Sequence, residues 1–452
     1  MTELLRRDLH TSVSDPLLDT MNFLNEITNR YPGAISFAPG RPYGGFFETE
    51  QLFGYLERYL AHLREQGRSA AAVRDAVYQY GPTGGQIREV IADWLVKDEN
   101  IRVAPESIVV TVGCQEAMLL ALRALVTGPD DLFLVSSPCY VGITGAAALL
   151  DIKVGAVHER NGGLHLEDLA SAVHAGRAAG RRARVFYTVP DHANPSGNTM
   201  PLPVRHELLE LAAELDLIVL EDSPYRLVSP GQQLPSLKSL DRHGRVVHLG
   251  SFSKTLLPGA RVGFAIADQI VRDESGGTSL LADELCKIKS MVTVNTSPLS
   301  QAVVAGMLLA HDGTVAELNR GMASYYGEAM RATLQCLDQE FPEARRDALG
   351  VHWNRPTGGF FLTLTVPFAA DNEALARCAE THRVLWTPMS YFYPLGGGSQ
   401  GIRLSISSLE PDDVGTGISR LAAFIRAETE ALQPAYGSIP GPQRSHPAPI
   451  RQ

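Results

Sequence analysis

The stretch RVVHLGSFSKTLLPGARVGFAIA, residues 245–267, contains two apolar runs separated by a polar turn. The runs at 245–253 and 261–267 are rich in apolar and β-branched residues, which is typical of buried strands. The turn places Lys254 between small hydroxyl residues, and Arg261 follows it by seven positions. A lone lysine is usually a solvated surface charge, so the rest of the chain has to explain this one.

Further apolar runs of the same kind alternate along the chain with segments whose apolar residues recur at intervals of three and four. The strand-like runs lie at 107–113, 131–138, 183–190 and 216–222, and the clearest helical segments lie at 115–125 and 203–215. This alternation predicts an α/β fold with a mainly parallel sheet between layers of helices.

After about residue 300 the pattern changes to one long helix, 299–341, followed by short strands around 359–366 and 401–407. This texture predicts a second, smaller α+β domain. We expect four parts: an N-terminal arm at 1–45 that contributes to the small domain, a large cofactor-binding domain at 46–310, a small domain at 311–430, and a flexible tail rich in Pro, Gly and Ser at 431–452.

Composition argues against several classes of function. The chain has 452 residues and a formal net charge of −10, without a basic stripe, which disfavours nucleic acid as a partner. No run approaches the roughly 20 apolar residues of a membrane span, and the first residues lack a signal-peptide core, so we expect a cytoplasmic protein. The five cysteines are scattered without metal-ligand spacing, which favours reduced thiols and no metal site.

Polar residues follow four of the expected strands, where open α/β sheets place their ligands. Asn194 lies in VPDHANPSG, Asp222 and Tyr225 lie in EDSPY, and Lys254 follows the run at 245–253. Pyridoxal phosphate requires such a set, because a lysine forms the Schiff base and a carboxylate keeps the ring nitrogen protonated, while an amide and a phenol can bond the 3-oxygen.

The cofactor's phosphate requires backbone N–H groups at a helix start, hydroxyls and an arginine. The residues that offer these groups are Gly113, Cys114, Gln115, Ser251, Ser253 and Arg261. Taken singly, such residues have ordinary structural explanations; Asp222 suits a helix N-cap and Asn194 suits a turn. Their ordered coincidence favours the cofactor site.

The motifs QYGPTGG, GCQEA, SSPCY, YTVPDHANPSG, EDSPY, GSFSKTLLPGARVG and GIRLSIS occur in this order. Through them the chain, from about residue 20 to 430, resembles the fold-type I, class I/II aminotransferases that depend on pyridoxal phosphate. Within that class it resembles the 2-aminoadipate/kynurenine group and the arylglycine-forming aminotransferases of antibiotic biosynthesis. The resemblance implies a seven-stranded, mainly parallel sheet flanked by helices, with a smaller α+β domain.

The resemblance also assigns roles. Lys254 would be the Schiff-base lysine and Asp222 the partner of the ring nitrogen, with Tyr140 stacked on the ring. Tyr80 would reach the cofactor phosphate of a neighbouring subunit, which implies a homodimer with shared active sites. The substrate would be held by Arg403, which clamps the α-carboxylate, together with Asn194, Gly40 and Tyr43.

The substrate is the least determined part. Arg41 and His192 depart from the pattern of the group, and the aromatic residues Tyr43, Phe46, Phe47, Tyr391, Phe392 and Tyr393 suggest a pocket lined by rings. The same residues could instead pack the N-terminal arm. We expect a ping-pong exchange between an aromatic amino acid, such as hydroxyphenylglycine or dihydroxyphenylglycine, and a 2-oxo acid.

Two other functions stay open at this stage. The same fold supports cyclases, lyases and decarboxylases that use pyridoxal phosphate, and aminotransferase-like domains serve as ligand sensors in bacterial regulators. One apparent motif we reject: GGGSQG at 396–401 has the spacing of a dinucleotide fingerprint, but it precedes a strand and no helix follows it.

Overall fold

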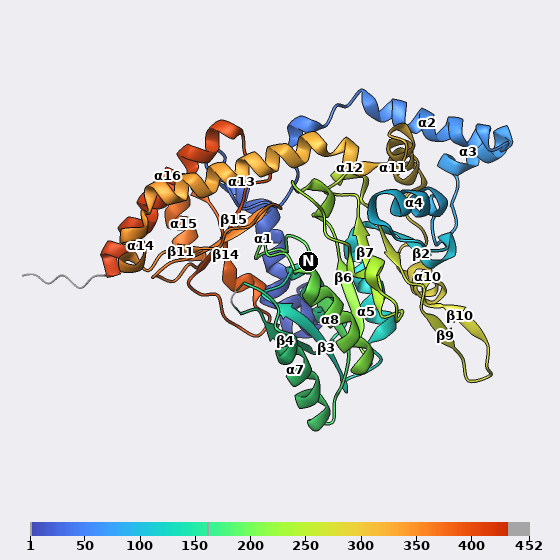
Figure 1. Ribbon diagram of the computed structural model, residues 1–452, viewed down its shortest axis with the longest axis horizontal. Helices are drawn as coiled ribbons and strands as arrows, with labels where there is room; N and C mark the ends of the chain where they lie inside the picture. The colour runs from blue at the N-terminus through green and yellow to red at the C-terminus, as the bar shows by residue number, and fades with distance from the viewer. Residues whose placement is uncertain (1, 161, 433–452) are drawn as a thin grey trace, which may run out of the picture.

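The computed structural model describes residues 2–160 and 162–432. Its largest sheet has seven strands in the order β2-β8-β7-β6-β5-β3-β4 (Figure 1). The strands are β2 (Ile108–Val112), β3 (Asp131–Ser137), β4 (Val154–His158), β5 (Arg182–Thr188), β6 (Ile218–Asp222), β7 (Val246–Ser251) and β8 (Val262–Ile266). In this sheet β8 is antiparallel to both neighbours and the other pairs are parallel. The predicted α/β class with a seven-stranded sheet is confirmed.

Helices cover both faces of this sheet (Figure 1). One face packs against α5 (Gly113–Leu125), α6 (Val141–Leu149) and α10 (Leu281–Val292). The other packs against α7 (Leu166–Ala178), α8 (Leu202–Glu214), α9 (Leu237–Leu240), α4 (Arg88–Trp94), α11 (Pro298–Ala310) and α2 (Gln51–Glu65). Because both faces are covered, the strands read as continuous apolar runs, which is why the sequence pattern located most of them.

A second sheet of four strands has the order β11-β12-β15-β14. Its strands are β11 (His352–Trp353), β12 (Phe361–Thr365), β14 (Thr387–Pro388) and β15 (Gly401–Ser405), and its core includes residues of α13 (Arg320–Glu340), α15 (Asn372–Thr381) and α16 (Pro411–Leu432). β1 (Ile35–Ser36) pairs in parallel with β13 (Val384–Leu385), so the arm joins this part of the chain.

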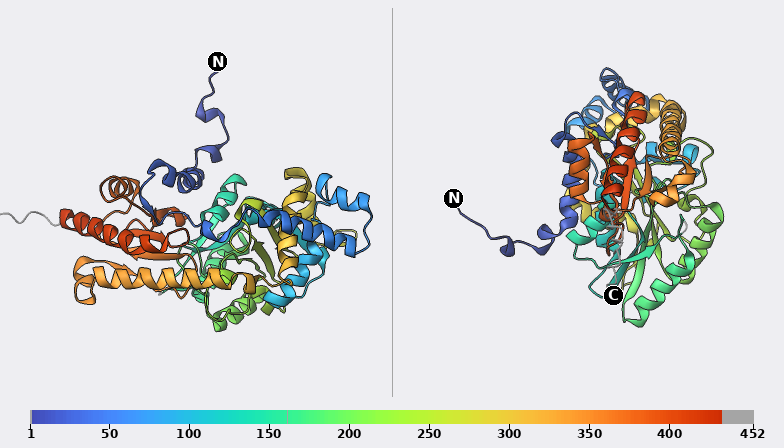
Figure 2. Two further views of the ribbon diagram at one scale, coloured as in Figure 1. Left: turned by 90° about the horizontal axis from the view of Figure 1, so that it is seen from above. Right: turned by 90° about the vertical axis from the view of Figure 1, so that its left-hand side faces the viewer.

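Peripheral elements complete the fold. α3 (Ala70–Tyr78) follows α2, β9 (Ile270–Arg272) and β10 (Thr278–Leu280) form a hairpin, and α14 (Glu343–Leu349) follows α13. The segment before α1 (Pro16–Arg30) extends away from the body of the molecule (Figure 2). The domain boundaries stay a prediction, and most of the expected tail, from residue 433 on, lies outside the described residues.

The structure corrects two details of the sequence analysis. β4 was not expected from the sequence; it is an edge strand whose residues are mostly half-buried, so its apolar pattern is weak. The expected helix 299–341 is three helices, α11, α12 (Val315–Leu318) and α13. The first break falls at Asp312 and Gly313, which both have positive φ, and two left-handed residues in succession cannot continue a right-handed helix.

Candidate active site

A cavity of about 340 Å³ lies at the carboxyl ends of the central strands. Twelve of the residues singled out from the sequence line it: Gly40, Cys114, Gln115, Tyr140, Asn194, Asp222, Tyr225, Ser251, Ser253, Lys254, Arg261 and Arg403. Parallel strands end at one edge of a sheet, so motifs far apart in the sequence converge there.

Lys254 follows β7 and points its amine toward the N-terminal arm, where Nζ donates to the carbonyl oxygen of Gly40 at 2.8 Å. Burial, together with the nearby positive charge of Arg261, lowers the pKa of Lys254 to about 8. A larger fraction of this amine is therefore uncharged at neutral pH than for an ordinary lysine, as a nucleophile or base requires.

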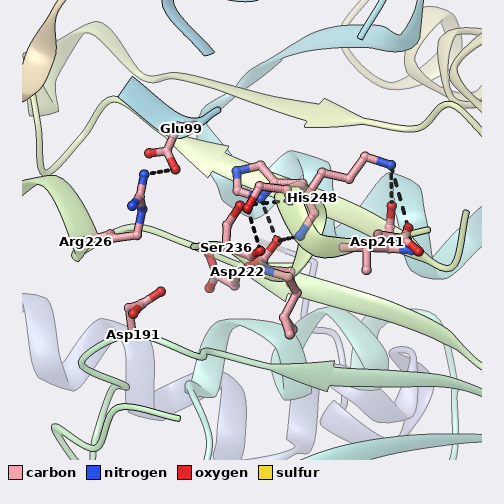
Figure 3. A network of polar contacts seen from close by, with 12 residues as sticks. Glu99, Asp191, Asp222, Arg226, Ser236, Asp241 and His248 are labelled. Carbon is pink, nitrogen blue, oxygen red and sulfur yellow. Dashed lines mark hydrogen bonds and ion pairs between the residues drawn. The ribbon is translucent and has the colours of Figure 1, made fainter. Parts of the chain in front are cut away.

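Asp222 ends β6 opposite Leu249 of the neighbouring strand β7, and His248, the preceding residue of β7, pairs with Glu221 (Figure 3). The Tyr187 hydroxyl donates to Asp222 Oδ2 at 2.7 Å, and the Cys114 thiol lies 3.5 Å from Oδ1. Burial raises the pKa of Asp222 to about 6, against the opposing effect of these donors. The carboxylate is therefore ionised at neutral pH inside a buried site.

An anion cradle forms at the start of α5. Arg261 Nη1 donates to Ser253 Oγ at 2.9 Å. Gly113 has φ +69°, and a Cβ on it would lie 2.5 Å from Arg261 Nη2. The positive φ favours glycine at this position, and a Cβ would displace the guanidinium. A helix start beside an arginine and a serine hydroxyl is suited to a phosphate group.

The turn into α5 has a buried support that the sequence did not reveal. Glu116 accepts from the backbone N–H of Val112 at 2.7 Å and from Lys289 Nζ at 2.7 Å. Thr293 Oγ1 donates to the other oxygen of Glu116 at 2.6 Å. Lys289 and Glu116 are 173 positions apart, so no local sequence signal pairs them.

Arg403 of β15 reaches the cavity from the smaller sheet. Its Nη1 donates to Asn194 Oδ1 at 2.9 Å, and Nη2 donates to the Ala38 carbonyl at 2.5 Å. The guanidinium lies between the rings of Phe361 and Phe392, at 4.6 and 4.8 Å. Burial lowers its pKa to about 10, so it stays charged at neutral pH.

Arg403 also carries an unsatisfied donor, because its buried Nε has no hydrogen-bond partner within the described residues. A buried guanidinium N–H without an acceptor is costly, and a carboxylate would satisfy it. Together with the amine of Lys254, the buried carboxylate of Asp222 and the anion cradle, this donor fits a pyridoxal phosphate site that also admits an amino acid.

Three residues singled out for the site from the sequence do not line the cavity: Gly113, which lies beside the Arg261 guanidinium, Tyr43 and Tyr80. Tyr43 stacks on Tyr325 at 5.0 Å between ring centres, and its hydroxyl donates to Glu410 at 2.7 Å. Tyr80 is 85% exposed on this chain and takes no part in its own cavity.

The expected pocket of rings also differs from the structure. Phe46 packs against Tyr43, and Tyr391 packs edge-on against Phe23 at 5.7 Å. Neither Tyr391 nor Tyr393 lines the cavity. Phe46 and Tyr391 pack against rings of the N-terminal arm, which was the other explanation of the same pattern, whereas Phe392 lies against the Arg403 guanidinium.

Other lining residues were given no role by sequence reasoning: Thr28, Asn29, Ala38, Pro39, Arg41, Met118, Val189 and Pro224. Thr28 and Asn29 belong to α1, an amphipathic helix whose pattern does not distinguish a cavity residue from a surface one. His192, the other departure noted above, is buried outside the lining, and burial lowers its pKa.

A family model described as aminotransferase class I and II matches residues 55–421. The chain belongs to this family. It is 47% identical over 430 residues to an (S)-3,5-dihydroxyphenylglycine transaminase of Amycolatopsis orientalis, covering 94% of this chain and 95% of the relative. It is 32% identical to a 2-aminoadipate transaminase of Thermus thermophilus, covering 90% and 94% of the two chains.

The fold agrees with this assignment. A kynurenine aminotransferase of Pyrococcus horikoshii, solved in complex with PMP, superposes with a TM-score of 0.76 at 29% identity, covering 92% of this chain and 95% of that one. The protein is therefore an aminotransferase that depends on pyridoxal phosphate and acts on an amino acid and a 2-oxo acid. No helix in residues 2–160 and 162–432 is long and apolar enough to cross a membrane.

Proposed function

We propose that this aminotransferase exchanges the amino group between an arylglycine, such as hydroxyphenylglycine or dihydroxyphenylglycine, and a 2-oxo acid. The observation that carries the proposal is the 47% identity, over 94% of the chain, to a relative named for dihydroxyphenylglycine. We further propose, from the resemblance of the sequence motifs to arylglycine-forming aminotransferases, that the reaction belongs to antibiotic biosynthesis. The five cysteines are unpaired thiols, which supports a cytoplasmic location.

In this proposal the cofactor is held by residues of four strand ends. Lys254 carries it covalently, Asp222 pairs with its ring nitrogen, and Asn194 and Tyr225 bond its 3-oxygen. The phosphate would be held by Gly113, Cys114, Gln115, Ser251, Ser253 and Arg261, while Tyr140 packs on the ring. The supporting observation is that ten of these eleven residues line one cavity. The eleventh, Gly113, lies beside the Arg261 guanidinium.

Bound pyridoxal phosphate supplies a protonated ring that accepts electrons from the substrate's Cα–H bond. Arg403 would hold the α-carboxylate, and its buried Nε is a donor without a partner in the described residues. With the substrate so oriented, Lys254 Nζ would remove the proton from Cα and deliver it to the carbon of the cofactor's aldehyde group. A lysine whose pKa is lowered to about 8 is suited to both directions of this transfer.

The side chain of the substrate would face the polar residues that remain in the lining. Thr28, Asn29 and Arg41 are the polar lining residues without a role in holding the cofactor or the α-carboxylate. Hydroxyl and amide groups can bond phenolic hydroxyls, and a site built on such bonds rejects rings that lack them. A phenyl ring attached directly to Cα would require a short pocket of this kind.

We further propose a homodimer in which each active site receives Tyr80 from the other subunit. Tyr80 is 85% exposed, and Tyr78, Met291, Val294 and Leu299 also expose apolar side chains. These residues come from two segments of the chain, around residues 76–86 and 291–299. The segments lie next to each other, because Gln86 Nε2 donates to the carbonyl oxygens of Ala76 and Pro298. Exposed apolar residues on one surface are a frequent sign of an interface.

The substrate proposal is tested by single-turnover rates with 3,5-dihydroxyphenylglycine, 4-hydroxyphenylglycine, phenylglycine, tyrosine, kynurenine and 2-aminoadipate. We expect the hydroxylated arylglycines to react fastest. In Asn29→Ala we expect the ratio of their rates to the rate of phenylglycine to fall. A tenfold or greater preference for 2-aminoadipate, about 1.4 kcal/mol in transition-state binding, would contradict the arylglycine proposal and would point to Arg41 as a carboxylate partner.

A further inference from the structure

The Asp222 carboxylate is held by a group that the proposed function does not use. Tyr187 lies on β5, the strand next to β6, and its side chain is fully buried. Its hydroxyl donates to Asp222 Oδ2 at 2.7 Å, the ordinary length of a strong O–H···O⁻ bond. The Cys114 thiol, 3.5 Å from Oδ1, is a weak donor by comparison.

The ring of Tyr187 is surrounded by apolar residues, and its hydroxyl donates to Asp222. The ring packs in the apolar layer formed by the central sheet with α5 and α6. Burial, with the negative charge of Asp222, raises the pKa of Tyr187 well above its usual value, so the hydroxyl keeps its proton at every working pH. It is therefore a permanent donor to the carboxylate.

We propose that Tyr187 is a positioning residue that keeps the Asp222 carboxylate ionised and fixed in orientation, and through it keeps the cofactor's ring nitrogen protonated. The inference rests on the proposed pairing of Asp222 with that nitrogen. It goes beyond that pairing because Tyr187 does not line the cavity in which cofactor and substrate would bind.

The charges around Asp222 show why one hydrogen bond matters. Burial disfavours the ionised carboxylate and raises its pKa. The hydrogen bonds from Tyr187 and Cys114 and the charges of His248 and Lys254 lower the pKa. The pKa that results, about 6, lies close to neutrality. Losing the Tyr187 donor would raise it further, and the shared proton would then move from the ring nitrogen toward the carboxylate.

The test uses holoprotein loaded with cofactor labelled with ¹⁵N in the ring, and it reads the nitrogen resonance between pH 6 and 8.5. In the wild type we expect the position of a protonated nitrogen. In Tyr187→Phe we expect the resonance to move toward the unprotonated position, and kcat to fall about tenfold with KM within about threefold, the equivalent of one pKa unit. Tyr59→Phe, which also alters a buried tyrosine but one remote from Asp222, should behave as wild type.

Asp222→Asn separates the two proposals. If Asp222→Asn moves the resonance and Tyr187→Phe leaves it unchanged, the Tyr187 inference is wrong and the role of Asp222 stands. If neither moves it, both are wrong. Should Tyr187→Phe fail to fold, 3-fluorotyrosine at position 187 decides: as a stronger donor it should raise the pH at which the nitrogen loses its proton, and an unchanged profile would overturn the inference.

Discussion

Burial changes the proton affinities of Lys254 and Asp222 in opposite directions. It lowers the pKa of the lysine to about 8 and raises that of the carboxyl to about 6. The charged form of each group is less stable in the fold than at the surface. Both groups therefore destabilise the cofactor-free protein. Functional residues often lower the stability of a protein in this way, so that replacing them by inert residues raises the free energy of unfolding.

The pH dependence that Asp222 gives to stability follows from its pKa. The pKa is 3.8 in an ordinary environment and about 6 in the fold, so folding disfavours the ionised form. The penalty is fully present above pH 6, fades between pH 6 and 4, and is absent below; two units correspond to about 3 kcal/mol.

We therefore expect the cofactor-free Asp222→Asn protein to unfold at higher urea concentration than the cofactor-free wild type at pH 8, with the difference shrinking at pH 5. Asp216→Asn is the control, because Arg245 lowers the pKa of that exposed carboxyl and its loss should not stabilise. An Asp222→Asn protein that is less stable than wild type at pH 8 would contradict the account.

At the scale of elements, the turn from β2 into α5 is the part of the site most constrained by geometry. Gly113 combines a positive φ with a 2.5 Å approach of Arg261 to the position of a Cβ, and Glu116 fixes the preceding Val112 N–H. Such a turn leaves no room for adjustment without moving the arginine that faces the phosphate.

We expect Gly113→Ala to lower the affinity for pyridoxal phosphate at least tenfold, about 1.4 kcal/mol, because the methyl group displaces Arg261 and strains the backbone. Equilibrium dialysis of the cofactor measures this. Gly128→Ala is the matched control, since nothing lies within 4 Å of its Cβ position. Equal affinities for the two variants would show that the turn does not hold the phosphate.

The sequence located elements whose signals are local and missed contacts that only the tertiary fold creates. Lys254, Asp222 and Asn194 follow buried apolar strands, so the strand pattern alone placed them at one sheet edge. Thr28 and Asn29 enter the cavity through the packing of α1, and Glu116 meets Lys289 across 173 positions. The aromatic residues around Tyr43 had two explanations, and Tyr43 itself stacks on Tyr325 and does not line the cavity.

For the whole molecule, the exposure of Tyr80 is what links the single chain to the proposed dimer. Tyr80 is 85% exposed and Tyr78 is 81% exposed, although tyrosine usually buries much of its ring. If Tyr80 serves the neighbouring site, two different inactive chains can together form one complete site.

We expect Tyr80→Ala and Lys254→Ala, each nearly inactive, to regain activity when refolded together. Half of the dimers would be hybrids with one intact site each, so about a quarter of wild-type activity should return. Tyr78→Ala alone should stay active, because no role in the neighbouring site is assigned to it. Activity of the mixture no higher than the average of the two separate proteins would contradict shared sites.

The central claim is that Lys254 carries the cofactor. Borohydride reduction of the holoprotein, followed by tryptic peptide mapping, tests it most directly, because the modified lysine resists cleavage. The account predicts one phosphopyridoxyl adduct on the uncleaved peptide 246–261, and no adduct in Lys254→Ala. An adduct on Lys287 or on Lys289, the buried partner of Glu116, would contradict it.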